Sequence, residues 1–377
     1  MSVELDPSPE LKPRQVDRSV EAIARSAHID PRIPALVPGF DAPFFQAGLA
    51  GYSDGPMRLI ARRHGCPFCI TEALLDLTLI NGGKGRTRED PDLLATECGT
   101  GDIEDNTPRA EGGLSDHPIA GQIMGTKPDT MAKGAMILLD MGYEVIDVNF
   151  ACPVKKIKKS NRGGHFLTSP REAIDVLKAV RDAVPKEIPT TVKLRRAWDD
   201  SDEMARNFEI VFNACYELGY AWTTVHCRTV QQKYLGPGKW EFLRDLTARH
   251  PDKIIFGSGD VWTVHDIFLM LEYTGVHAAS VARGCIGNPW IFRQARQLMR
   301  GELPTSPTLR EQRDVLLDHF QLSMALHGER NASRIMRKFG IKFSAHHPTP
   351  DAVKNEFIRC HSVSQWRDVL DRHYNEA

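Results

Sequence analysis

Short hydrophobic runs recur along the chain, and each is followed by a stretch with helical spacing. The runs are rich in apolar and β-branched residues and lie at residues 44–48, 68–72, 119–124, 145–149, 190–194, 222–226, 254–257 and 278–281. One intervening stretch, residues 169–184 (SPREAIDVLKAVRDAV), begins with Ser and Pro and has apolar residues three and four apart, which predicts an amphipathic helix. Strand-then-helix units repeated eight times predict an α/β fold, the TIM (β/α)8 barrel of about 250 residues.

A doubly wound open sheet is the main alternative architecture. It would place its glycine-rich signal after the first strand. In this chain the glycines follow the last two predicted strands, as Gly257-Ser258-Gly259-Asp260 and Ala282-Arg283-Gly284. The pattern therefore favours the barrel.

The regions around the repeating units predict the remaining organisation. Residues 1–40 open with MSVELDPSPELKPRQ and are interpreted as a polar N-terminal arm, and residues 41–303 form the barrel. Residues 81–118 break the rhythm and are rich in Gly, Asp, Glu and Thr, so they are an insertion over the barrel mouth, either a functional lid or a surface loop. Residues 304–377 show apolar positions at helical spacing and predict a small C-terminal all-helical domain.

Composition narrows the class of protein. Lys and Arg number 48 against 49 Asp and Glu, and 41% of residues are hydrophobic, values that fit a soluble globular enzyme and argue against disordered or collagen-like chains. No apolar run approaches the roughly 18 to 20 residues of a spanning helix, and the start lacks a signal-peptide core, so a cytoplasmic protein with no membrane partner is expected. Because the net charge is −1, any nucleic-acid partner must be held by local basic patches.

The eight cysteines are spread along the chain, which suits free thiols in a reducing compartment. The pair in Cys66-Pro67-Phe68-Cys69 has the spacing of metal ligands. A closed site needs four ligands, and no second pair of this kind is present, so no metal is expected.

The glycine-rich segments after the last two predicted strands indicate a phosphorylated ligand. TIM barrels commonly hold phosphate with the loops after strands seven and eight. Gly259 and Asp260 follow the seventh strand, and Ala282, Arg283 and Gly284 follow the eighth. Glycine lets backbone amides approach an anion, and the arginine adds a positive charge.

Three other strand ends carry polar side chains suited to a flavin. Gln122, Lys193 and His226 lie at the ends of the third, fifth and sixth predicted strands. Each places a donor or a positive charge where a reduced, anionic flavin ring needs one. A lone histidine is more often a core residue, but its register with the other two favours the functional interpretation.

The segment Asn149-Phe150-Ala151-Cys152-Pro153-Val154-Lys155-Lys156 follows the fourth predicted strand. Pro153 keeps the chain extended, so the Cys152 thiol is presented from a loop and can donate a proton; the alternative is a small packed side chain. Asn149 has the donors and acceptor that read a pyrimidine-like ring.

Two basic clusters predict a polyanionic substrate. Residues 155–162 (KKIKKSNR) contain five basic side chains, and Arg330, Arg334, Arg337, Lys338 and Lys342 are spaced about one helical turn apart. A solvated charged surface is the ordinary explanation of such runs. Beside a reactive cysteine they are hypothesised to anchor nucleic acid.

These motifs resemble the tRNA-dihydrouridine synthase family. The resemblance rests on AGLAGYSD, TEAL, GQIMG, VIDVNFACPVKK, GGHFL, VKLR, VHCRTVQQKYLGPGKW, GSGD and ARGCIGNPWIFRQ, which span residues 44 to 294. It implies an FMN-binding TIM barrel with a helical RNA-binding domain. The implied activity is NADPH- or NADH-driven reduction of uridines in tRNA. Ala151, Cys227 and the first motif depart from the commoner family pattern.

The resemblance also implies roles for individual residues. Cys152 resembles the family's general acid, and Asn149 its uracil contact. The flavin contacts it implies are Ala47, Gly48, Leu49, Gln122, Lys193, His226, Gly259, Asp260, Ala282, Arg283 and Gly284. The residues expected to bind the RNA substrate are Lys155, Lys156, Arg228, Arg334, Arg337 and Lys338.

Two alternatives remain open at this point. One is a flavin-dependent reductase of a free pyrimidine, of the dihydroorotate or dihydropyrimidine dehydrogenase type. The other is an RNA-binding flavoprotein without turnover. The basic clusters argue against the first, and the intact Cys152 with Asn149 argues against the second.

Overall fold

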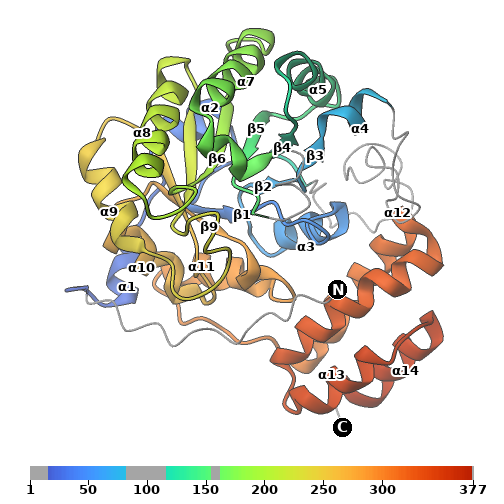
Figure 1. The fold of residues 1–377 in the computed structure, drawn as a ribbon. Helices are drawn as coiled ribbons and strands as arrows, with labels where there is room; N and C mark the ends of the chain where they lie inside the picture. The colour runs from blue at the N-terminus through green and yellow to red at the C-terminus, as the bar shows by residue number, and fades with distance from the viewer. Residues whose placement is uncertain (1–15, 82–115, 154–161, 376–377) are drawn as a thin grey trace.

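The computed structural model describes residues 16–81, 116–153 and 162–375 as a parallel barrel ringed by helices, with further helices at the C-terminal end (Figure 1). The strands are β1 (Phe44–Gln46), β2 (Cys69–Ile70), β3 (Leu74–Leu75), β4 (Ile119–Met124), β5 (Val145–Phe150), β6 (Thr190–Arg195), β7 (Trp222–His226), β8 (Ile255–Ser258) and β9 (Ala278–Val281). The sheet closes because β1 pairs with β9, and β2 pairs with both β1 and β4. The predicted (β/α)8 barrel is confirmed; β3 is a short additional strand beside β4.

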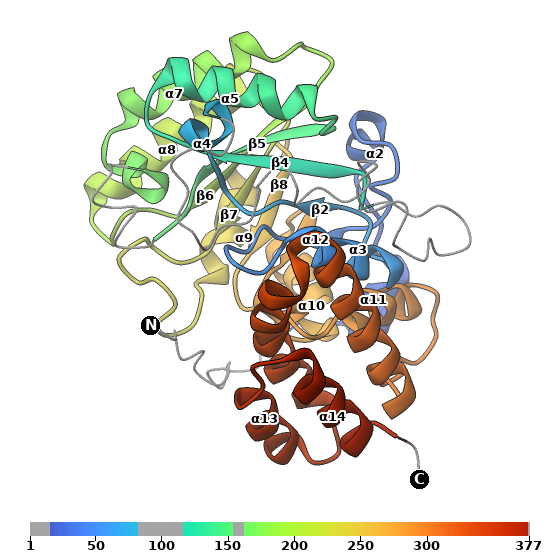
Figure 2. The ribbon, with the colours of Figure 1, turned by 90° about the vertical axis from the view of Figure 1, so that its right-hand side faces the viewer.

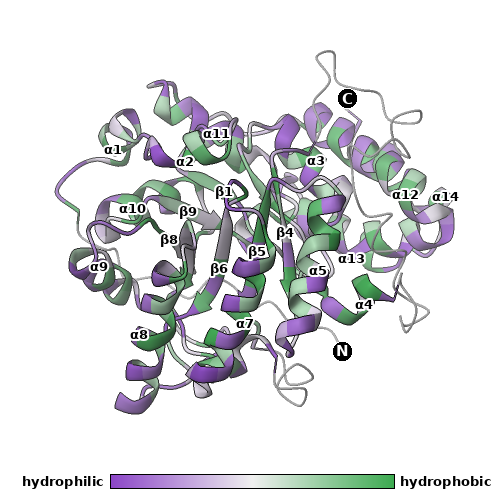
Figure 3. Cartoon of the chain, turned by 90° about the horizontal axis from the view of Figure 1, so that it is seen from above, coloured by the Kyte–Doolittle hydropathy of each residue, from purple (hydrophilic) through white to green (hydrophobic). Residues whose placement is uncertain are grey.

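Helices cover the barrel and also form the C-terminal region. The described α-helices are α1 (Val20–Ser26), α2 (Arg32–Leu36), α3 (Gly55–Arg63), α4 (Asp76–Ile80), α5 (Pro128–Asp140), α7 (Pro170–Ala183), α8 (Asp202–Glu217), α9 (Trp240–Arg249), α10 (Val264–Thr274), α11 (Trp290–Met299), α12 (Leu309–Phe343), α13 (Pro350–Ile358) and α14 (Val363–His373). Helices of the ring carry hydrophilic and hydrophobic residues, as expected for elements with one face inward and one in solvent (Figure 3). None of these helices is long and apolar enough to cross a bilayer.

The N-terminal end of the barrel is closed by an aromatic cluster. Phe40 is fully buried and packs against residues at the starts of several strands, with ring centroids 4.6 Å from Phe68 and 5.9 Å from Phe256. Ile33 and Val37 are buried in the same cluster. Residues 16–40 therefore differ from the polar arm expected from sequence. Helix α2 brings Ile33 under the barrel, and α1 buries Ile23 and Ala24 where it packs against α10 and α11. Residues 1–15 lie outside the described part.

The C-terminal helices pack directly against the barrel. Leu322 of α12 forms a buried cluster with Leu59 and Ile60 of α3, and the two helices lie side by side in Figure 2. Within the helical domain, the Trp366 ring stacks on Phe320 at 4.4 Å. The predicted C-terminal helical region is confirmed. Helix α12 contains a break at Gly328, whose backbone angles are not helical.

Replacing Phe40 tests whether it closes the barrel. Phe40→Ala removes a fully buried ring and should lower the free energy of unfolding by about 3–5 kcal/mol, measured by urea denaturation. The matched control is Leu36→Ala, because Leu36 is close in sequence but 43% exposed. The control should change the free energy of unfolding by no more than about 0.5 kcal/mol. Equal small losses in both variants would contradict this role.

Candidate active site

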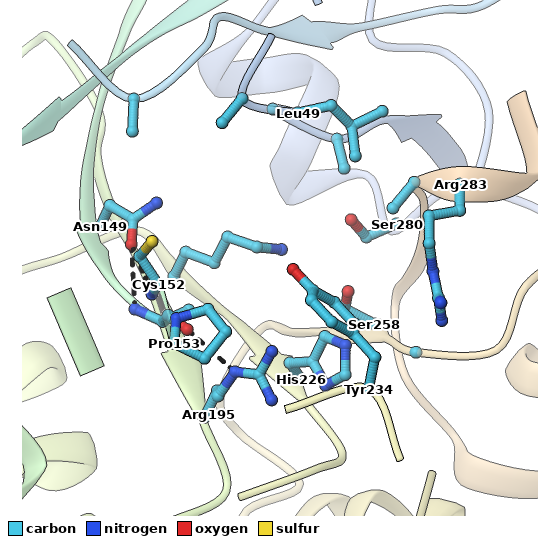
Figure 4. A pocket seen from close by; sticks show the side chains of 18 of the residues that line it. Leu49, Asn149, Cys152, Pro153, Arg195, His226, Tyr234, Ser258, Ser280 and Arg283 are labelled. Carbon is cyan, nitrogen blue, oxygen red and sulfur yellow. Dashed lines mark hydrogen bonds between the residues drawn. The ribbon is translucent and has the colours of Figure 1, made fainter. Parts of the chain in front are cut away.

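A pocket lies at the C-terminal ends of the barrel strands, where the fold predicts it. It encloses about 960 Å³, counting its open mouth. Figure 4 shows Cys152 and Asn149 on one side of the pocket, Arg283 and Ser280 on the other, and Leu49 on a third wall. The structure brings these predicted residues together on its walls: Ala47, Gly48, Leu49, Gln122, Asn149, Cys152, Lys193, His226, Gly259, Asp260, Ala282 and Arg283. Gly284 lies behind the wall, where a Cβ would be 2.4 Å from the Val261 carbonyl oxygen.

Hydrogen bonds to the Asn149 side chain hold the loop that carries Cys152. The Asn149 Oδ1 atom accepts from the backbone N–H groups of Ala151 (3.0 Å) and Cys152 (3.1 Å). The following segment packs closely, because Gly163 has a φ of 58° and a Cβ there would lie 2.9 Å from the Cys152 Cβ. The half-buried thiol thus sits on an ordered turn after β5. The sequence predicts only a substrate contact for Asn149, whereas in the structure its side chain also shapes this turn.

The pocket wall carries positive charge near the centre of the barrel. Burial lowers the pKa of the Lys193 ammonium to about 8, although the Asp147 carboxylate opposes that shift. Burial and the nearby Arg195 and Lys193 charges hold the pKa of His226 well below its usual range, so this ring is neutral. Its Nδ1 accepts from the Arg228 N–H at 3.2 Å, which leaves the ring proton on Nε2 as a donor.

The loops after β8 and β9 form the opposite wall of the pocket. Gly259 has a φ of 123°, and a Cβ there would be 2.4 Å from the Cys227 sulfur. The Arg283 guanidinium lies 4.3 Å from the centre of the Trp262 ring and remains partly exposed. The Ser280 hydroxyl is buried without a hydrogen-bond partner among the described residues. A cationic side chain, a glycine-lined backbone and an unpaired hydroxyl together suit a phosphorylated ligand.

Arg228 and Asp260 have a different arrangement from the one expected. Arg228 is fully buried, and its Nη2 donates to both carboxylate oxygens of Asp260 at 2.7 and 2.8 Å. Asp260 also accepts from the Gly238 N–H at 2.6 Å. Arg228 is therefore away from the pocket surface, and the pair ties the loops after β7 and β8 together. The sequence could not reveal this pairing, because the two residues are 32 positions apart.

Arg195 and Tyr234 also line the pocket but were not predicted as site residues. Arg195 is buried, and its Nε donates to the Ala151 carbonyl at 2.9 Å. Its Nη1 donates to the carbonyls of Thr229 and Lys233, both at 2.8 Å. The position of Arg195 at the end of a barrel strand, two residues after Lys193, is the signal that could have identified it.

The predicted RNA-binding residues lie partly on the helical domain. Arg330 and Arg334 are exposed on α12, and Arg337 is half-buried and hydrogen-bonded to His361. Lys338 instead turns toward the barrel, where it donates to the Gly51 carbonyl and lies over the Tyr52 ring. Lys338 thus joins α12 to the loop that lines the pocket. Lys155 and Lys156 lie outside the described residues.

The residues present fit a flavin mononucleotide. Lys193 and His226 offer donors at the centre of the pocket, while Arg283, Ser280 and the Gly259 backbone gather at one end. This arrangement matches a ligand with an electron-rich ring and a phosphate. The sulfurs of Cys66 and Cys69 lie 3.9 Å apart, but no group of three or more metal-ligating side chains occurs within residues 16–81, 116–153 and 162–375.

Comparisons with known proteins identify the family. A family model described as dihydrouridine synthase matches residues 46–377. The chain is 30% identical over 307 residues to a probable tRNA-dihydrouridine synthase of Treponema pallidum, covering 80% of this chain and 84% of that protein. It is 30% identical over 330 residues to tRNA-dihydrouridine synthase B of Pseudomonas aeruginosa, covering 85% and 91%.

A solved structure of histamine dehydrogenase from a Rhizobium species shares the fold. The TM-score is 0.52 at 11% identity, and the match covers 81% of this chain and 51% of the other. The resemblance drawn from the sequence motifs is confirmed by the family model and by the two relatives. The chain therefore belongs to the dihydrouridine synthase family of enzymes.

Proposed function

We propose that this chain reduces the 5,6 double bond of selected uridines in tRNA to give dihydrouridine, with bound FMN and with NADPH or NADH as reductant. The observation that carries this proposal is the shared pocket: Cys152 faces the same cavity as Lys193, His226 and Arg283. A proton donor and a flavin-compatible set of cations therefore meet around one space. The names of the relatives from Treponema and Pseudomonas support tRNA as the substrate.

The pocket residues divide into two groups around the proposed cofactor. Gln122, Lys193 and His226 would hold the FMN ring, and Gly259, Ala282 and Arg283 would hold its phosphate. The chemistry that FMN supplies when bound is transfer of a hydride from the reduced nicotinamide to one carbon of the uracil double bond. The Lys193 charge and the His226 Nε2 proton favour electron density on the ring beside them.

Cys152 completes the reduction as general acid. Its S–H bond breaks as a C–H bond forms on the second carbon of the uracil double bond, and the thiolate recovers a proton from solvent. The Arg195 guanidinium, held by the carbonyls of Ala151, Thr229 and Lys233, supplies positive charge near the thiolate. Asn149 is proposed to contact the uracil through the part of its amide that faces the pocket.

The substrate uridine must leave its stack to enter this pocket, which costs a few kcal/mol. Interactions with the RNA backbone offset that cost. We assign those interactions to Arg330, Arg334 and Arg337 of α12, and to Lys155 and Lys156, which follow Cys152 in the sequence. We also propose the cytoplasm as the place of action, in keeping with the spread of cysteines along the chain.

Replacing the thiol tests the role of Cys152. Cys152→Ala should slow uridine reduction by about 10²-fold or more, because general acid catalysis contributes about 10²–10⁴-fold. Reduction of the bound flavin by NADPH should be unchanged, because it does not require this proton. Both rates are followed by stopped-flow absorbance with tRNA lacking dihydrouridine. Cys215→Ala is the control, since Cys215 is buried within α8; equal tRNA reduction by the Cys152 variant and the parent would refute the assignment.

The lowered pKa of Lys193 predicts a pH dependence. Lys193 is charged below a pKa of about 8 and neutral above it. Affinity for FMN, measured by fluorescence quenching, should therefore fall as the pH rises through about 8. Lys193→Arg should keep its affinity over the same range, because arginine stays charged. An identical pH profile in the parent and this variant would show that Lys193 does not control flavin binding.

Salt dependence tests the assigned RNA surface. Removing one cation that neutralises an RNA phosphate should reduce the slope of log Kd against log salt by about 0.7 to 0.9. Arg334→Ala with Arg337→Ala should reduce the slope by up to about twice that amount. Arg171→Ala, an exposed arginine on α7, is the control and should leave the slope unchanged. An unchanged slope in the α12 variant would place the RNA on another surface.

A further inference from the structure

A buried carboxylate near the pocket has no role in the reaction proposed above. Asp147 lies in the middle of β5 and is 1% exposed. Its Oδ2 accepts from the Gln122 Nε2 at 2.7 Å, and its Oδ1 accepts from the Thr191 hydroxyl at 2.6 Å. Asp147 does not line the pocket, although the side chain that it binds, Gln122, does.

A chain of hydrogen bonds runs from Asp147 to the Cys152 turn. Gln122 donates from Nε2 to Asp147 and accepts at Oε1 from the Asn149 Nδ2 at 2.7 Å. Asn149 then accepts at Oδ1 from the N–H groups of Ala151 and Cys152. Two side-chain amides therefore link a buried acceptor to the backbone that carries the proposed acid. Figure 4 shows the last step, in which the Asn149 side chain meets the turn of Cys152.

The direction of this chain follows from the chemistry of its ends. Both Asp147 oxygens accept hydrogen bonds, so Gln122 presents its NH2 group to Asp147 and its oxygen to Asn149. Backbone N–H groups only donate, so Asn149 must present its oxygen to the turn and its NH2 group to Gln122. The Asp147 carboxylate and the backbone N–H groups of the turn therefore require the same orientation of the Gln122 and Asn149 amides, so each amide has one defined orientation.

We propose that Asp147 is a positioning residue that orients Gln122 and, through Asn149, the turn of Cys152. Asp147 contributes a hydrogen-bond acceptor for the NH2 group of the Gln122 side chain. This role deepens the proposed function and rests on it, since the turn matters through its thiol. Without the acceptor, the Gln122 NH2 group is buried and unpaired, which favours rotation of the amide away from Asn149.

The alternative explanation for an effect of Asp147 on the reaction is its negative charge, because its carboxylate also acts on Lys193 and raises the pKa of that ammonium. Two substitutions separate the explanations. Asp147→Ala removes both the acceptor and the charge. Asp147→Asn removes only the charge, because its Oδ1 can accept from Gln122 while its NH2 group faces the Thr191 oxygen. Asp147→Val, which suits a strand, replaces the alanine variant if that variant does not fold.

The test measures tRNA reduction and Cys152 alkylation on each purified full-length variant. Asp147→Ala should slow uridine reduction by about 10- to 100-fold, as expected for a misplaced reacting group. Flavin reduction by NADPH should fall less than uridine reduction, because Gln122 is one of several residues proposed to hold the flavin ring. Asp147→Asn should keep uridine reduction within about threefold of the parent. Thr191→Val, which removes the other hydrogen bond to Asp147, is the matched control and should behave like the parent.

Alkylation by iodoacetamide, followed by mass spectrometry, reports on the turn independently of turnover. Asp147→Ala should alter the rate at Cys152 by more than about threefold, because the turn loses its fixed position. The buried cysteines Cys215 and Cys285 are internal controls. In an Asn149→Ala background, Asp147→Ala should have little further effect on either measurement, because the connection is already broken.

Three results would overturn the proposal. Uridine reduction could fall equally in Asp147→Asn and Asp147→Ala, which would assign the effect to charge, or it could fall as much in Thr191→Val as in Asp147→Ala. The third result is that the losses caused by Asp147→Ala and Asn149→Ala are additive. Failure of the proposed function is distinguishable from these results. A parent protein that does not reduce tRNA would refute that function, while the alkylation rates would still decide whether Asp147 positions Cys152.

Discussion

The pairing of β2 with β4 is the constraint on which the site depends. It joins Cys69 to Ile119 and Ile70 to Ala120 across a long intervening segment, and so closes the sheet. Because all the strands of the closed barrel are parallel, their carboxyl ends meet around one opening. Leu49 after β1 and Arg283 after β9 therefore face Cys152 after β5. An open sheet with the same strands would leave these residues along an edge.

Local electrostatics reconciles a net charge of −1 with the proposed RNA substrate. Asp260 takes up the charge of Arg228 in a buried pair, and this pair braces two loops. Lys193, Arg195 and Arg283 line the pocket, where Arg195 also binds backbone carbonyls and Arg283 lies 3.7 Å from the same Asp260 carboxylate. A net charge near zero is therefore compatible with a positively charged pocket, because several acidic side chains lie inside the protein or elsewhere on its surface.

The sequence was sufficient for the barrel and for residues directly at strand ends. Periodicity located the strands, and a strand end in a parallel barrel points to the mouth, so Lys193, His226 and Arg283 could be placed. Features set by packing between distant segments could not be predicted. Arg228 looks like a further cation near the site, but it is paired with Asp260 in the fold.

The same limit applies at the barrel floor and on the C-terminal helices. Phe40 stands in a region without periodicity, and only the fold shows that it fills the barrel floor. Helical spacing groups Lys338 with Arg334, yet Lys338 binds the Gly51 carbonyl because α12 packs beside α3. The links from Asp147 through Gln122 to Asn149 also need β4 and β5 in register, because Gln122 lies opposite Asp147 across these two strands.

The proposed function requires this pocket to pass reducing equivalents to uridine within tRNA. The most direct measurement reduces the protein-bound flavin with NADPH without oxygen, removes excess NADPH, and then adds tRNA lacking dihydrouridine. If the proposed function is right, the absorbance of oxidised flavin returns, with dihydrouridine formed in equal amount. The proposed function would be contradicted if tRNA left the flavin reduced while free orotate or uracil restored the absorbance.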